Sequence, residues 1–102
     1  MQPAGKNLYE QPEVKNLCKA FLALQSEEEC VLFLQDLMTI REIQDMTQRL
    51  SVAQLLREGL GYSQIMERVS VSSATISRVN RCLSYGDGGY ETVLSRIQED
   101  AK

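Results

Sequence analysis

Hydrophobic residues recur at helical spacing along most of this chain. Between Glu13 and Leu24 they fall three or four positions apart, and they do so again from Thr39 to about Glu58, where nothing interrupts the pattern. No segment shows the strict alternation of a half-buried strand. The pattern therefore predicts an all-α chain of about six helices, the longest of which spans roughly 30 Å.

Capping residues indicate where two of these helices begin. Ser26 is followed three positions later by Glu29, and Thr39 is followed by Glu42, which is the spacing of a capping box. The three consecutive acids that open the first of these helices, residues 27–29, suit the positive end of a helix dipole and do not suggest a catalytic pair.

Glycines mark the ends of the later helices. Gly59 and Gly61 end the long helix, as glycines at C-termini commonly do. The run SYGDGG at 84–89 predicts a flexible turn, and a last amphipathic helix follows it, with apolar positions at Tyr90, Val93, Leu94 and Ile97.

The helix that begins after Ser26 is apolar around most of its circumference. Val31, Leu32, Phe33 and Leu34 follow one another without a polar residue between them. Such a helix must be covered on several sides, and one short chain offers few coverings. We therefore expect a partner chain, in a homodimer, to cover it.

Residues 62–83 have the pattern of a helix-turn-helix. Ile65 and Val69 lie four apart on a first short helix, Val71 follows in the turn, and Ile76 and Val79 lie three apart on a second helix. This set packs two short helices at a steep angle over one small core.

The outward positions of the second helix carry short polar groups or Arg and Asn donors. Arg can read guanine, Asn can read adenine, and small residues allow close approach to the major groove, so the pattern favours binding to double-stranded DNA. Gln64 and Arg68 on the first helix are expected to contact the DNA backbone. The candidate base or phosphate contacts on the second helix are Ser73, Ala74, Thr75, Ser77, Arg78, Asn80 and Arg81.

A purely structural helix pair would show a similar apolar set. Two positions also differ from the usual pattern, because Met66 stands where a small residue is commonest and Ser70 stands where the turn usually has glycine. Against this alternative, Ser72 or Ser73 supplies an N-cap for the second helix.

Composition and charge narrow the function further. The 102 residues suggest one helical domain, 11–102, after a loose N-terminal arm, 1–10. The net charge is −3, yet residues 62–85 hold three arginines and one glutamate. So few cations predict weak, salt-sensitive binding by one copy, which favours two copies acting together.

Other function classes lack the residues they need. The chain has no histidine and no closely spaced cysteine pair, so we expect no metal site, and nothing suggests a cofactor or catalytic residues. Cys18, Cys30 and Cys82 lie far apart and are interpreted as free thiols of a cytoplasmic protein. No apolar run is long enough for a membrane span, and no signal-peptide pattern opens the chain.

From Leu17 to Ile97 the chain resembles the Trp repressor superfamily. The resemblance is closest at residues 55–57, 63–64 and 74–78, and residues 41–44 and 80–86 resemble its YerC/YecD-like branch more specifically. It implies an intertwined homodimer whose two helix-turn-helix heads enter successive major grooves of a roughly palindromic site. It also implies a transcriptional regulator, most simply a repressor that occludes a promoter.

In tryptophan-responsive members of the superfamily, two arginines flank the indole and a glycine follows the second arginine. Arg78 matches that second arginine, but Val79 stands at the glycine, and Gln48 stands at the first arginine with Arg49 beside it. Met38 replaces a threonine. Arg49 and Arg78 are the candidate ligand-binding residues, but lost charge and added bulk predict that tryptophan does not bind.

Two alternatives remain open at the level of sequence. A repressor of the same fold could sense another small metabolite. The same helical dimer could instead present its head to a protein, such as the transcription machinery, since the positive charge of the head is modest.

Overall fold

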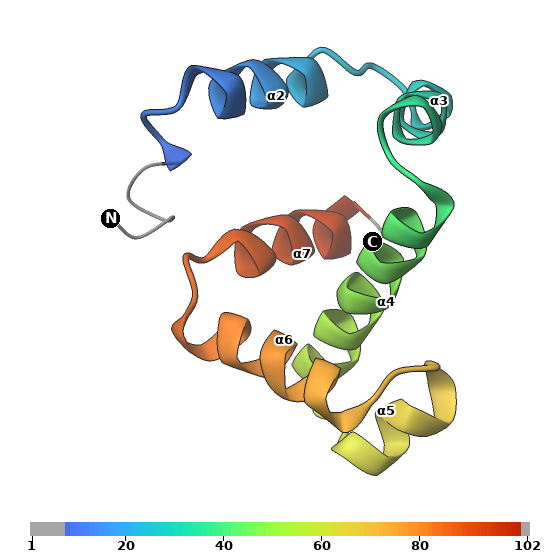
Figure 1. Cartoon of the computed structure of the whole chain (residues 1–102). Coiled ribbons are helices and arrows are strands. Elements are labelled where there is room, and N and C mark those ends of the chain that lie inside the picture. The colour runs from blue at the N-terminus through green and yellow to red at the C-terminus, as the bar shows by residue number, and fades with distance from the viewer. Residues whose placement is uncertain (1–7, 101–102) are drawn as a thin grey trace. The chain divides into compact units, whose positions relative to one another are not determined.

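The computed structural model describes residues 8–100 and the side chains of residues 8–98, so residues 1–7 of the expected arm lie outside it. The described part contains no strand, which confirms the all-α class. None of its helices is long and apolar enough to cross a membrane. The helices are α2 (Pro12–Leu22), α3 (Glu27–Leu37), α4 (Ile40–Arg57), α5 (Tyr62–Arg68), α6 (Ser73–Tyr85) and α7 (Gly89–Asp100) (Figure 1).

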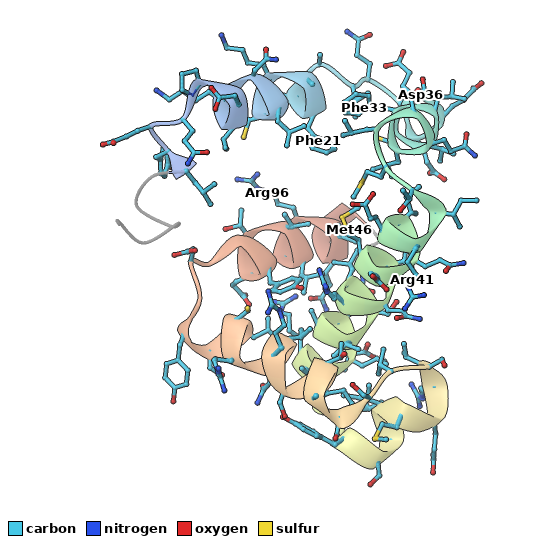
Figure 2. All side chains as sticks on the ribbon, viewed as in Figure 1. Phe21, Phe33, Asp36, Arg41, Met46 and Arg96 are labelled. Atoms are coloured by element: carbon cyan, nitrogen blue, oxygen red, sulfur yellow. The ribbon has the colours of Figure 1, made fainter. Side chains whose placement is uncertain are left out.

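The chain divides into two compact units, one ending at Thr39 and the other beginning at Ile40. In the first unit, Phe21 of α2 and Phe33 of α3 meet edge to face, with ring centroids 5.5 Å apart (Figure 2). This geometry is favourable for two aromatic rings. Neither α2 nor α3 has a buried side chain, however, so the aromatic pair is not part of an enclosed core.

The N-terminus of α3 forms where the capping pattern predicts it. Ser26 Oγ accepts a hydrogen bond from the backbone N–H of Glu29 at 3.1 Å. The Glu29 carboxylate accepts in return from the N–H of Gln25 at 2.9 Å, one residue earlier than in a standard capping box. Together the two bonds satisfy backbone donors that the helix itself cannot pair.

The second unit is built around α4. Helices α5, α6 and α7 all contact α4, and α6 also contacts α5 and α7 (Figure 1). Six buried apolar side chains from all four helices form its core. They are Val52, Ala53, Ile65, Ile76, Val79 and Leu94.

Helix α4 ends in a Schellman motif. Gly59 has a φ of +93°, a conformation that residues with a Cβ rarely adopt. Its N–H donates to the carbonyl of Leu56 at 3.0 Å, and the N–H of Leu60 donates to the carbonyl of Leu55 at 3.2 Å. Leu60 and Leu55 both pack against the core of this unit.

The turn before α7 is shorter than the sequence suggests. The expected turn at 84–89 is wrong at both ends, because α6 continues through Tyr85 and α7 begins at Gly89. The N–H of Gly86 donates to the carbonyl of Cys82 at 2.9 Å and closes the last turn of α6. A Cβ on Gly86 would lie 2.3 Å from that carbonyl oxygen, so this position requires glycine.

Helix α7 is attached to the rest of the unit by both apolar and polar contacts. Leu94 is only 2% exposed and belongs to the core. Arg57 Nη2 lies 2.9 Å from Glu91 Oε1 in an ion pair, and the hydroxyl of Ser95 donates to the same carboxylate oxygen at 3.1 Å. These contacts hold α7 against the helix that also carries α5 and α6.

Candidate nucleic-acid interface

The helix-turn-helix consists of α5, α6 and the connection at 69–72. Ser72 caps α6, since its Oγ accepts from the N–H of Thr75 at 3.2 Å. None of the described residues other than glycine has a positive φ, so Ser70 occupies the turn without the backbone conformation that would favour glycine. The two departures from the usual pattern therefore do not prevent the turn from forming.

Two side chains fix α6, the second helix of the helix-turn-helix, onto the rest of the unit. Ile76 is fully buried and Val79 is 2% exposed, and both belong to the core that includes Val52 and Ala53 of α4. Burial of a side chain of this size contributes about 1.5–3 kcal/mol. The rotation of α6 about its own axis is set by this contact.

The opposite face of α6 is directed outward. A helix turns by about 100° per residue, so Ala74, Arg78, Arg81 and Tyr85, spaced four, three and four apart, form one stripe opposite Ile76 and Val79. All four residues of this stripe are exposed. The helix contains two arginines and no acidic residue, so the stripe is locally positive within a chain of net charge −3.

The other candidates lie beside this stripe or on α5. Ser73, Ser77 and Asn80 are exposed on the flanks of α6, whereas Thr75 is half-buried. The Thr75 hydroxyl lies 3.2 Å from that of Ser72, within the cap. The structure thus brings all seven α6 candidates onto one helix, with Ala74, Arg78 and Arg81 the most outward.

The two candidates on α5 differ in their surroundings. Gln64 Oε1 accepts from the N–H of Gly61 at 2.9 Å and caps α5, which leaves its amide N–H groups to donate outward. Arg68 is exposed and lines an open groove between α4, α5 and α7, together with Glu58, Val69 and Leu94. Arg68 therefore lies on α5 but borders residues of α4 and α7 as well.

Two tyrosines at this surface were missed by sequence reasoning. Tyr62 opens α5, and its phenol oxygen lies 3.4 Å from Ser77 Oγ, across 15 residues of sequence. Tyr85 ends α6 and is 88% exposed. The sequence could have indicated Tyr85, because a spacing of four residues places it on the same helix face as Arg81. The contact of Tyr62 with Ser77 could not be predicted in this way, because it depends on how α5 and α6 cross.

The candidate ligand-binding arginines are on different helices of this unit. Arg49 is an exposed residue of α4 and Arg78 an exposed residue of α6. Neither lines the groove beside Arg68, nor the second, mostly apolar hollow formed by Leu50, Cys82 and Tyr90 among others. Val79, which stands at the expected glycine, is enclosed in the core.

Comparison with known proteins places this arrangement in a family. The sequence model of the Trp repressor protein family matches residues 12–98. The uncharacterized protein YerC of Bacillus subtilis (strain 168) is 49% identical over 87 residues, which cover 85% of this chain and 84% of the relative.

Solved structures agree with the sequence comparison. The crystal structure of a TrpR-like protein from Eubacterium eligens ATCC 27750 superposes with a TM-score of 0.86 and 42% identity, over 90% of this chain and 95% of that one. A crystal structure from Staphylococcus aureus gives a TM-score of 0.83 and 40% identity, over 86% of this chain and 88% of that one. These matches confirm the resemblance first seen in the sequence motifs, and the chain belongs to the Trp repressor family, in its YerC-like branch.

Proposed function

We propose that this member of a family of DNA-binding regulators is a sequence-specific transcriptional repressor that acts as a homodimer in the cytoplasm. One observation carries the proposal: the exposed stripe of Ala74, Arg78 and Arg81 lies opposite the buried Ile76 and Val79. A helix held in this way presents small residues and arginines together, the combination that suits the floor and walls of a major groove.

The state of α2 and α3 supports the dimer. Neither helix has a buried side chain, and Leu32 of α3 remains 55% exposed. Uncovered apolar faces of this kind mark interaction sites. A second copy is the simplest covering, because two reading heads also compensate for the small number of cations on one head.

The burial of Val79 supports a regulator that does not respond to tryptophan. Val79 packs in the core between α6 and α4, so α6 is positioned by a side chain of the protein itself. A ligand shifts a conformational equilibrium only by its different affinity for the two conformations. If α6 already occupies its DNA-binding position without a ligand, a small ligand can add little to DNA affinity.

Selection of genomic DNA fragments by the purified protein, at about 100 mM salt with and without tryptophan, tests the proposal. Enrichment of one palindromic site in both conditions is the expected result. Enrichment only with tryptophan would contradict the interpretation of Val79. No enrichment in either condition would instead favour the head as a protein-binding surface or the need for another effector.

Two substitutions of Arg81 separate base reading from phosphate contact. Arg81→Ala is expected to weaken binding by about 1–3 kcal/mol if Arg81 reads a base. Arg81→Lys keeps the charge but loses the planar, bidentate donor pair. If Lys restores affinity fully, Arg81 contacts phosphate. If Lys binds as poorly as Ala, Arg81 reads a base.

A further inference from the structure

The hydroxyl groups of Tyr62 and Ser77 meet where α5 and α6 cross. Ser77 Oγ lies 3.4 Å from the phenol oxygen of Tyr62, in a geometry that suits donation from Ser77 to Tyr62. This distance is long for a hydroxyl pair, whose usual separation is about 2.7–2.8 Å, so a small adjustment would tighten it. Both groups lie at the surface, since Tyr62 is 37% exposed and Ser77 is exposed.

The direction of this bond decides what each hydroxyl can offer to a ligand. A hydroxyl has one proton and two lone pairs. When Ser77 gives its proton to Tyr62, Ser77 can only accept a further hydrogen bond from outside. Tyr62 then keeps its own proton and can donate it outward.

An acceptor at Ser77 and a donor at Tyr62 suit different parts of a DNA duplex. In the major groove, the amino groups of cytosine and adenine donate, whereas guanine N7 and O6 and thymine O4 accept. Phosphate oxygens only accept, and hydroxyl groups such as that of Tyr commonly bind them. An acceptor at Ser77 therefore suits an amino-bearing base, and a donor at Tyr62 suits a phosphate.

We propose that Tyr62 is part of the DNA-reading surface and sets the hydrogen-bonding polarity of Ser77. In the complex, a base amino group donates to Ser77, Ser77 donates to Tyr62, and Tyr62 donates to a phosphate oxygen. This proposal rests on the proposed DNA-binding function and names a specificity device within it. Linked hydrogen bonds of this kind strengthen one another.

The packing of the two helices does not depend on the Tyr62 hydroxyl. Ile65 and Ile76, both fully buried, join α5 and α6 to the core. The hydroxyl of Tyr62 can thus be removed by Tyr62→Phe while the ring and the fold are retained.

The test measures affinity and base preference together. Wild type and Tyr62→Phe are titrated against the selected site and against all single-base variants of one half-site. Tyr62→Phe is expected to bind the preferred site about ten-fold less tightly. It is also expected to lose the preference for an amino-bearing base at one position only, because its Ser77 hydroxyl is free to donate or accept.

Two further variants make the result specific. Ser77→Ala should lose the preference at the same base pair, and the double variant should lose no more than Ser77→Ala there. Tyr90→Phe, which removes a hydroxyl from α7 in the same unit, should retain both affinity and base preference.

Three results would overturn the proposal. These are an unchanged affinity and base profile for Tyr62→Phe, an equal loss on every sequence, or a changed preference at a position different from that of Ser77→Ala. A wild-type protein that selects no DNA would overturn the proposed function itself and is distinguished by the failure of the unmodified chain. Thermal unfolding of each variant verifies the fold.

Discussion

The two units, which meet between Thr39 and Ile40, both contain helices with many apolar residues, but they bury these residues to different extents. In the unit formed by α4–α7, six apolar side chains are buried and a further set packs against them. In the unit that holds α2 and α3, neither helix buries any side chain, although Phe21 and Phe33 meet edge to face. The unit that carries the helix-turn-helix therefore has its own core, whereas α2 and α3 lack one.

This difference indicates where the stability of each part comes from. A helix with a buried face is stabilised by contacts within one chain, but short helices without such contacts are marginal in water. We infer that α4–α7 is stabilised within the protomer, and that α2 and α3 gain most of their stability from a second copy. The following predictions test this division, beginning with the largest effect.

Removing a core side chain should give the largest loss. Ile65→Ala is expected to lower the free energy of unfolding by about 2–5 kcal/mol, because it leaves a cavity in the core of α4–α7. Met66→Ala, the next residue on the same helix, is 47% exposed and should cost much less. Chemical denaturation measures both. Equal losses for the two variants would mean that α5 is not seated as described.

Val79→Gly should loosen the reading head. The loss of a buried Val and the gain of a helical Gly together cost about 2–4 kcal/mol, and DNA affinity should fall with them. Ser84→Gly, at an exposed position in the last turn of the same helix, is a control that adds a glycine to α6 without removing a buried side chain. Unchanged DNA affinity in Val79→Gly would rule out the proposal that Val79 positions α6 for DNA binding.

Leu32→Asp should act on α3 without damaging the head. An acid on the apolar face is expected to weaken self-association by about 2 kcal/mol, and sedimentation should then detect monomers at concentrations where wild type is dimeric. Gln35→Asp, an exposed polar position on the same helix, adds the same charge as a control. A monomeric wild type would contradict the expected covering of α3.

Removing a helix cap should give the smallest loss of stability, and two equivalent caps, one in each unit, can be compared. Ser72 caps α6 and Ser26 caps α3, each by accepting from a backbone N–H three residues later. Either Ser→Ala change should cost about 1 kcal/mol. The cost of Ser72→Ala should be independent of protein concentration, whereas that of Ser26→Ala should appear mainly in the association equilibrium. Identical behaviour of both variants would remove the distinction between the units.

Local patterns predicted most of this fold. The cap at Ser26, the glycine end of α4 and the helix-turn-helix depend on residues within a few positions of one another, and each formed as expected. The end of α6 was placed too early because the run at 84–89 resembles a turn in composition, although Ser84 and Tyr85 still have helical partners. The Tyr62–Ser77 contact escaped prediction because it depends on the crossing of α5 and α6.

The number of residues in α4 sets the rotation of the helix-turn-helix about the axis of this helix. Because α5 and α6 share a core with Val52 and Ala53 of α4, a residue inserted into α4 before Val52 must turn both helices about the α4 axis, relative to the start of α4. One inserted residue amounts to about 100° of rotation and 1.5 Å of translation. Substitutions in α4 therefore leave this angle unchanged, whereas insertions and deletions alter it.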